Sequence, residues 1–284
     1  MFEFLIPQKS VTGHVVLITG GAMGIGRLMA LKFAKLGAIV LVWDLNVQLG
    51  HEVVKEIETL GGQAHFYEMD VTNRDKVYAV GKTIVDKFGA VDILINNAGI
   101  VGGTPLLESN DRVIEKTMAV NATSHFWTIK AFLPKMLTRN SGHIVSIASA
   151  GGVFGCGGMV DYGASKFAAI GIMTSLRQEL ETMNKDGIHL TIINPSFIKT
   201  GMFEGVTAPR LTPILSPEYV AERIVRAVRR NQWRVLIPGD MALLEMMLTI
   251  VPHWLGHLLV RWCRVGSAMK TFKQTRPHAA LKNE

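Results

Sequence analysis

The chain has 284 residues, of which 48% are hydrophobic and 19% charged, and this length suits one or two globular domains with a large buried core. Only two cysteines are present, Cys156 and Cys263, so a disulfide-rich scaffold is excluded and free thiols are expected. The formal net charge is +7, but the bases are not interleaved with aromatic residues and no nucleic-acid motif is present, so we expect no nucleic-acid partner.

The opening residues, Met1–Pro7, contain a short apolar run that Glu3 interrupts. This run is too short for the hydrophobic core of a signal peptide. We therefore expect no leader and a cytoplasmic site of reaction, with any attachment to a membrane coming from elsewhere in the chain.

A glycine-rich turn at residues 20–26 follows an apolar, β-branched run of strand length at residues 14–19. A helical pattern of apolar residues comes next and ends before Gly37. Strand, glycine turn and helix in this order form the context of a dinucleotide-binding fingerprint, because glycine lets the backbone approach a pyrophosphate at the N-terminus of the helix. A turn that is rich in glycine for steric reasons alone is the competing explanation.

Asp44 follows the next apolar run, at residues 38–43. An acidic side chain at the end of the second strand accepts hydrogen bonds from the adenosine ribose hydroxyls, and it would repel a 2′-phosphate. Position 23 in the turn is Met rather than a base, and Leu45 follows Asp44, so no cation is placed for a 2′-phosphate. The sequence therefore favours NAD over NADP as the coenzyme.

Apolar segments alternate with helical stretches along the whole chain. They lie at residues 15–19, 39–43, 64–69, 93–96, 143–146, 189–194 and 234–237. This alternation predicts an α/β fold with a parallel sheet that carries helices on both faces. The nine histidines show no spacing typical of a zinc site, so we expect no metal.

Tyr162 and Lys166 lie four residues apart, so on a helix they share one face. A phenol normally has a pKa near ~10, and a fixed ammonium beside it lowers that pKa. Such a pair can move a proton on and off a substrate hydroxyl. Taken alone, the pair fits an ordinary surface contact equally well. Cys156 precedes it and is expected to line a pocket without reacting.

The composition changes after Pro238, where Pro252 separates two apolar stretches at residues 241–251 and 253–262. Neither stretch approaches the ~20 apolar residues of a membrane-spanning helix. Tryptophans and the flanking bases suit helices that lie in a membrane interface, so residues 241–264 are a candidate for peripheral membrane contact. A flap that closes a substrate pocket, or a contact with a second subunit, explains the same pattern. Residues after about Thr271 are polar and are expected to fray.

Several of these features together resemble the short-chain dehydrogenase/reductase superfamily. The glycine turn matches its TGxxxGxG motif, residues 96–99 match its NNAG segment, and Tyr162 with Lys166 matches its YxxxK motif. Residues 195–200 match PGxxxT, except that Ser196 replaces the glycine. The resemblance therefore does not fix the backbone conformation at this position. The resemblance implies a Rossmann-type doubly wound sheet of seven parallel strands in the order 3-2-1-4-5-6-7, followed by a C-terminal helical extension.

The resemblance covers residues from about 12 to 237. We therefore assign residues 1–237 to a Rossmann-fold catalytic and NAD-binding domain. Residues 238–284 are assigned to an apolar and basic helical appendage of the same domain.

The resemblance also implies the site residues. Ser149, thirteen residues before Tyr162, would hold the substrate oxygen, and Asn121 would hold a water that relays protons from Lys166 to solvent. An amide buried and satisfied by backbone is the other explanation of Asn121. The catalytic set is thus Ser149, Tyr162, Lys166 and Asn121. The residues implied at the coenzyme are Gly20, Met23, Gly24, Ile25, Gly26, Asp44, Asp70, Val71, Asn97, Ala98, Gly99, Tyr162, Lys166, Pro195, Ile198 and Thr200.

The short sequence segments at residues 41–44, 124–127 and 165–169 resemble those of the branch of hydroxysteroid and retinol dehydrogenases that work on lipid surfaces. We expect an NAD-dependent oxidoreductase that interconverts a lipophilic alcohol (a steroid, a retinoid or a long-chain alcohol) and its carbonyl, with Tyr162 as acid/base. The pocket would be lined by the apolar side chains Val153, Phe154, Met159, Met202 and Phe203. The resemblance further implies a homodimer or homotetramer.

Two alternatives remain open from the sequence. One is an NADPH-dependent carbonyl reductase. The other is a non-catalytic nucleotide-binding scaffold on membranes, against which the complete set of Ser149, Tyr162 and Lys166 argues.

Overall fold

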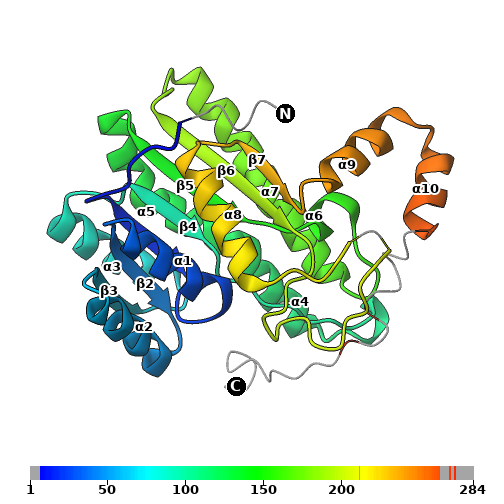
Figure 1. The fold of residues 1–284 in the computed structure, drawn as a ribbon, viewed down its shortest axis with the longest axis horizontal. Coiled ribbons are helices and arrows are strands. Elements are labelled where there is room, and N and C mark those ends of the chain that lie inside the picture. The colour runs from blue at the N-terminus through cyan, green and yellow to red at the C-terminus, as the bar shows by residue number, and fades with distance from the viewer. Residues whose placement is uncertain (1–6, 211, 263–268, 270–271, 273–284) are drawn as a thin grey trace.

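The computed structural model describes residues 7–210 and 212–262, together with Met269 and Phe272. Within these residues, seven parallel strands form one sheet in the order β3-β2-β1-β4-β5-β6-β7 (Figure 1). This is the fold class and the strand order that we expected. The strands are β1 (Val15–Thr19), β2 (Ile39–Asp44), β3 (Gln63–Glu68), β4 (Ile93–Asn96), β5 (Gly142–Ile147), β6 (Ile188–Pro195) and β7 (Arg234–Ile237).

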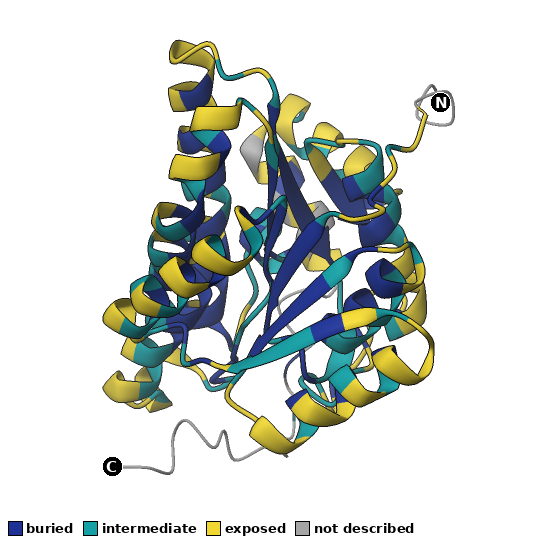
Figure 2. Ribbon diagram, turned by 90° about the vertical axis from the view of Figure 1, so that its left-hand side faces the viewer, coloured by how far each residue is buried: buried dark blue, intermediate teal, exposed yellow. Residues whose placement is uncertain are grey.

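Helices cover both faces of the sheet, and Figure 2 shows the buried strands between two layers of helices whose outer sides are exposed. Apolar residues of the strands therefore pack on both faces, which explains why their segments read as continuous apolar runs. One face carries α1 (Gly24–Lys35), α2 (Val47–Thr59) and α8 (Pro217–Arg229). The other face carries α3 (Arg74–Phe88), α5 (Ser124–Arg139) and α7 (Val160–Thr182).

Local side chains fix where several helices begin. Asn46 and Asn73 cap α2 and α3, because their side-chain oxygens accept hydrogen bonds from Leu49 N and Lys76 N. Ser216 caps α8 in the same way, and Pro217 occupies its first turn, where a missing N–H costs nothing. These caps satisfy backbone donors that would otherwise lack partners at the helix ends.

One helical segment after β4 is irregular. The helix α4 (Asp111–Met118) passes into the π-helical turn η3 (Ala119–Thr123), which continues as α5. Wider turns of this kind are often found at functional sites. Two further short elements are η2 (Leu106–Glu108), before α4, and α6 (Gly151–Phe154), between β5 and α7.

The predicted strand boundaries are close to the observed ones, and the differences lie at strand ends. The third strand was expected at residues 64–69 but runs over Gln63–Glu68, in register with the second strand from Ile39↔Gln63 to Asp44↔Glu68. Met69 lies just beyond this register, although its N–H still donates to Asp44 O at 2.9 Å. Pairing with the neighbouring strand, which apolar runs alone cannot show, decides such ends.

Two helices beyond β7 project from the body of the molecule, α9 (Met241–Ile250) and α10 (His253–Trp262) (Figure 1). Pro252 ends α9 because a proline restricts the preceding residue, and Val251 is accordingly extended. The half-buried ion pair between Arg234 of β7 and Glu245 of α9, at 2.6 Å, ties α9 to the sheet. Across the described part of the chain, no helix is long and apolar enough to cross a bilayer.

Candidate active site

The glycine turn after β1 is built by a close approach of two backbone segments. A side chain on Gly26 would collide with the carbonyl oxygen of Gly20, and a Cβ on Gly20 would lie 2.9 Å from the Cα of Ala98. The Asn97 Nδ2 donates to Thr19 O at 2.9 Å and to Gly20 O at 3.0 Å. Glycine is therefore required at both positions by packing as well as by any ligand.

Thr19 completes this support, although we did not include it among the site residues. Its Oγ1 accepts hydrogen bonds from Asn97 N at 2.9 Å and Ala98 N at 3.0 Å. One hydroxyl thus joins the carboxyl end of β1 to the segment after β4. The sequence signal for it is its place as the threonine of the TGxxxGxG motif, directly before the glycine turn.

Asp44 is held in place at the end of β2 by backbone donors. Its Oδ2 accepts from Ala22 N and its Oδ1 from Asn46 N, each at 3.0 Å. Each carboxylate oxygen keeps a second lone pair. The fixed carboxylate lines the cleft where we expected the adenosine ribose.

Asp70 has more partners than the sequence suggested. Its Oδ1 accepts from Thr72 N at 2.8 Å and Thr72 Oγ1 at 2.7 Å, and Lys116 Nζ lies 3.3 Å from Oδ2. Partial burial alone would raise the pKa of Asp70, but the Thr72 hydrogen bonds and the Lys116 ammonium outweigh it and hold the pKa below its usual value. Lys116 also lines the cleft and was missed, because nothing in the sequence marks it among other helix lysines.

The cleft above the carboxyl ends of the strands has a volume of about 850 Å³. Every residue that we expected at the coenzyme lines it, from the glycine turn to the segment after β6. A glycine cradle at the N-terminus of α1 and a carboxylate at the ribose end suit a dinucleotide. The structure therefore brings the expected coenzyme residues together, while their individual roles remain predictions.

Ser149, Tyr162 and Lys166 meet at one end of this cleft. Lys166 Nζ donates to Ile147 O at 2.9 Å and lies 5.6 Å from the centre of the Tyr162 ring. A hydrogen bond between the side chains of Ser149 and Tyr162 acts to lower the pKa of the phenol, against the larger effect of burial described below. Ser149 Oγ lies 3.5 Å from Pro195 O, which is long for a hydroxyl donor, so the hydroxyl is available to the phenol.

The protonation of this pair differs from our expectation. Burial raises the pKa of Tyr162 to about 12, with Ser149 opposing and Cys156 adding to the rise. Burial likewise lowers the pKa of Lys166 to about 8. The expected lowering of the phenol pKa is therefore wrong for the protein alone, because burial is the largest cause of the shift and raises the pKa.

Asn121 lies in the π-helical turn and is fully buried. Its Nδ2 donates to Ile100 O at 2.9 Å and to Ser165 Oγ at 3.0 Å, and its Oδ1 accepts from Ile100 N at 2.8 Å. Both donors of the amide are thus used within the protein. This geometry fits a structural clamp between the segment after β4 and α7, the second of the two explanations. The Oδ1 keeps a second lone pair, so the role of Asn121 in holding a water stays a prediction.

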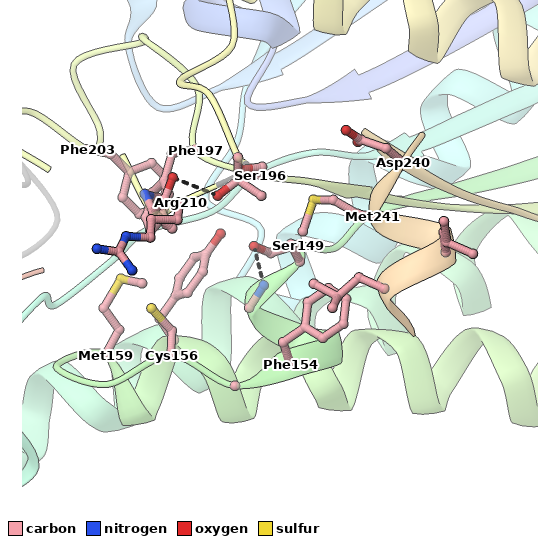
Figure 3. Close-up of a pocket in the computed structure, with 18 of the residues that line it drawn as sticks. Ser149, Phe154, Cys156, Met159, Ser196, Phe197, Phe203, Arg210, Asp240 and Met241 are labelled. Atoms are coloured by element: carbon pink, nitrogen blue, oxygen red, sulfur yellow. Dashed lines mark hydrogen bonds between the residues drawn. The ribbon is translucent and has the colours of Figure 1, made fainter. Parts of the chain in front are cut away.

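An apolar pocket of about 390 Å³ adjoins the cleft, and Figure 3 shows Ser149, Ser196 and Phe203 in its wall. These three residues and Tyr162 line both the pocket and the cleft. Phe154, Met159 and Phe203 lie in the pocket wall as expected, whereas Met202 lines the cleft instead and Val153 lines neither. Further wall residues come from the segment after β6 and from α9, as the explanation of residues 241–251 as a flap over a substrate pocket predicts. They are Phe197, Pro209, Arg210, Thr212, Asp240, Met241, Leu243, Leu244 and Met247.

Cys156 is a free thiol in this pocket, as we expected. Burial raises its pKa to about 11, so the unreactive thiol is the dominant form at neutral pH. Among the described residues, no three histidine, cysteine or acidic side chains gather as a metal site would require. The expectation that the protein needs no metal stays a prediction.

Comparison with known proteins identifies the relatives of this chain. The family model described as short chain dehydrogenase matches residues 14–210. The human protein named epidermal retinol dehydrogenase 2 is 41% identical over 269 residues, which are 94% of this chain and 87% of that protein.

Two solved structures extend the comparison to the fold and the coenzyme. A short-chain dehydrogenase/reductase from Burkholderia phymatum in complex with NAD is 25% identical, with a TM-score of 0.74, over 82% of this chain and 92% of that one. A metagenomic short-chain oxidoreductase in complex with NADP is 28% identical, with a TM-score of 0.68, over 80% and 98%. Structures of similar fold thus hold either coenzyme.

Proposed function

The chain belongs to the short-chain dehydrogenase family and is an oxidoreductase of the NAD(P)-binding type, and from this we propose that it uses NAD to interconvert a lipophilic alcohol and its carbonyl. One observation carries the proposal. Ser149 and Tyr162 lie where the coenzyme cleft meets an apolar pocket, so a reacting carbon in the pocket would face both the hydroxyl pair and the coenzyme.

The bound nicotinamide supplies the hydride chemistry. Tyr162 takes the proton of the substrate hydroxyl in oxidation and returns it in reduction. Ser149 donates a hydrogen bond to the substrate oxygen, where charge changes in the transition state. Lys166, held by Ile147 O at 2.9 Å, keeps a positive charge near the phenol and stabilises its deprotonated form.

The fixed carboxylate of Asp44 supports NAD as the preferred coenzyme. A 2′-phosphate on the adenosine ribose would add negative charge beside a carboxylate that Ala22 and Asn46 hold in place. Arg27, on the first turn of α1, forms an ion pair with Glu56 and does not line the cleft. A reductase that uses NADPH is the competing proposal, and the coenzyme preference of the purified protein decides between them.

The lining of the pocket supports a retinoid, a steroid or a long-chain alcohol as substrate. Apart from Ser149 and Tyr162 at the reactive end, its walls are mainly aromatic and aliphatic. The name of the human relative points to retinol. Because α9 contributes part of the wall, we infer that residues 238–284 are an appendage of the catalytic unit at residues 1–237.

Peripheral membrane contact through residues 241–264 is part of the proposal. Apolar side chains of α9 and α10 face solvent, with Ile250 exposed by 76% and Trp254 by 65%. Leu243 and Met247 both line the pocket and are exposed by 58% and 44%, so the pocket wall continues into this apolar surface. A lipophilic substrate could then pass from lipid into the pocket without crossing water. The expected cytoplasmic location stays a prediction.

A homodimer or homotetramer is also proposed. Phe126 on α5 and Phe167 on α7 are each exposed by 48%, on the helices that follow the fourth and fifth strands. Exposed aromatic residues on neighbouring helices suit a contact between subunits.

Coenzyme-dependent oxidation of retinol, a steroid alcohol and a long-chain alcohol, followed as absorbance of the reduced coenzyme, tests the function. We expect turnover with NAD, and we expect Tyr162→Phe to reduce kcat by roughly 10²–10⁴-fold while NAD still binds, because only the proton transfer is lost. Full turnover by Tyr162→Phe would reject its role. Coenzyme binding without turnover of any alcohol or carbonyl would instead favour the non-catalytic scaffold.

A further inference from the structure

Phe272 lines the coenzyme cleft, although it lies far beyond the last strand in sequence. It is the only Phe, Tyr or Trp after Trp262, in a stretch that is otherwise mostly polar. Our expectation that residues after about Thr271 fray is therefore wrong for this residue, which is half-buried and whose N–H donates to Met269 O at 3.0 Å.

The ring of Phe272 rests on the backbone of Gly103. A Cβ on Gly103 would collide with Phe272 Cε1 and lie 2.7 Å from its Cδ1. Gly103 also has a φ of +74°, which side chains other than glycine rarely adopt. The segment after β4 thus has a bare backbone surface where the ring sits, and the glycine is required by both its conformation and its neighbour.

Met269 provides a second attachment point for the same part of the chain. Its side chain is only 8% exposed and lies against Gly158, where an added Cβ would be 3.2 Å from Met269 Cβ. Met269 and Phe272 belong to one apolar cluster with Tyr162 and Phe203. The ring is therefore placed by contacts on two sides of the reactive end of the cleft.

We propose that Phe272 is a coenzyme-retaining residue, which covers the nicotinamide end of the cleft and slows release of the bound coenzyme. The inference rests on the proposed function. Phe272 lines the cleft together with Met202 and Phe203, which follow Thr200, the residue expected at the nicotinamide carboxamide. An aromatic ring at this rim removes apolar surface from water when the coenzyme is bound and limits access of solvent to the reacting atoms.

Fluorescence titration of the full-length protein with NADH and NADPH, without substrate, tests the proposal, and stopped-flow displacement measures release. We expect Phe272→Ala to weaken binding of the preferred coenzyme about tenfold, mainly through faster dissociation. Gly103→Ala should have a similar effect because its Cβ displaces the ring. The variant that carries both Phe272→Ala and Gly103→Ala should have the same affinity for the coenzyme as the single variant with the lower affinity, since both changes remove the same contact.

Gly61→Ala is the matched control. Gly61 has a φ of +79°, close to that of Gly103, but an added Cβ would meet nothing within 4 Å. It therefore carries the same backbone strain without displacing a ring, and we expect unchanged coenzyme binding. Equal or tighter binding by Phe272→Ala, or fully additive effects of the two changes, would overturn this inference alone. A wild-type chain that binds neither coenzyme would overturn the proposed function, and this inference with it.

Discussion

Tyr162 and Lys166 are almost fully buried, with 5% and 4% of their surface exposed. Burial disfavours the charged form of each, which gives pKa values of about 12 for the phenol and about 8 for the ammonium. At neutral pH the protein alone therefore holds a neutral phenol beside a largely protonated lysine, the states that reduction of a carbonyl needs. Oxidation of an alcohol needs the phenolate, so its rate should rise with pH and gain from the positive charge of oxidised nicotinamide.

Two serines near the end of β5 give a matched test of the site. Ser149 lines the cleft and the pocket, whereas Ser146 is fully buried in β5 and lies 3.5 Å from His125 Nδ1. We expect Ser149→Ala to lower kcat about 10²-fold, because a donor to the substrate oxygen is lost. Ser146→Ala should keep kcat within a few-fold. Steady-state kinetics with the same alcohol compare the two, and a larger loss in Ser146→Ala would mean that the wrong serine was chosen.

Asp44 determines the coenzyme preference in this proposal. Replacement by alanine removes both the ribose acceptor and the negative charge that opposes a 2′-phosphate. We expect Asp44→Ala to reduce kcat/KM with NAD about tenfold and to leave kcat/KM with NADP unchanged or higher. The ratio of the two values is the measurement. A ratio equal to that of the wild-type protein would show that selection lies elsewhere in the cleft.

Among the elements, the helices α9 and α10 together form one surface that is attached to the body of the molecule. The Arg234–Glu245 ion pair and the buried Met241 attach α9 to β7, while Arg210 lies over the Trp262 ring of α10 at 5.4 Å. Each helix still presents apolar side chains to solvent. Apolar side chains that cluster on the exposed surface of α9 and α10 are typical of a surface that binds another molecule or a membrane. Arginines near these helices favour an anionic lipid surface.

Charge placed on this unit tests the membrane contact. We expect the double change Ile250→Glu and Trp254→Glu to abolish most cosedimentation with vesicles that contain anionic lipid, because a carboxylate resists entry into the interface. Leu60→Glu is the control, since Leu60 is exposed by 73% at the end of α2, away from these helices. Equal loss in both proteins would point to the overall charge rather than to α9 and α10. Turnover of a short soluble alcohol should not change.

In the whole molecule, Lys9, which precedes β1, packs against the amino-terminal edge of the sheet, opposite the cleft. Lys9 N donates to Arg229 O at 2.7 Å, and Lys9 Nζ lies 2.9 Å from His143 Nδ1 on β5. His143 Nε2 lies 2.7 Å from Thr191 Oγ1, which donates to Gln232 O at 2.6 Å. Because the threonine proton is used in that bond, Nε2 carries the imidazole proton and Nδ1 accepts from Lys9.

This contact makes stability depend on pH. Burial lowers the pKa of Lys9 to about 8 from 10.5, against the opposing field of Asp92. Between these values the unfolded chain holds a proton that the folded chain has lost, so the free energy of unfolding rises with pH across this window. We expect Lys9→Met to lack the part of this rise that Lys9 contributes, so that Tm of the wild-type protein gains on Tm of Lys9→Met between pH 8 and pH 10. Lys55→Met, at an exposed position of α2, should follow the wild type. Parallel curves for all three proteins would contradict the prediction.

Local sequence was sufficient for the strands, and the resemblance of several motifs to a known family supplied their order and most residues of the cleft. Strands that are buried on both faces appear in the sequence as apolar runs. The glycine turn, Asp44 and the pair of Tyr162 and Lys166 are recognised by their short-range spacing along the chain, and the structure places all of them at the cleft. Strand ends were less certain because partner strands decide them, as at Met69.

Only the tertiary structure could decide what lies around the reactive end. Lys116 beside Asp70 and the ring of Phe272 come from segments far from the motifs in sequence, and no local pattern marks such contacts. For α9 the sequence left a membrane surface, a pocket flap and a subunit contact open, and the structure places α9 in the pocket wall. The proton affinity of Tyr162 was misjudged for the same reason, because it depends on how completely the fold removes solvent from the phenol. Spacing along the chain determines which groups share a face, whereas burial and long-range packing determine the state in which they meet.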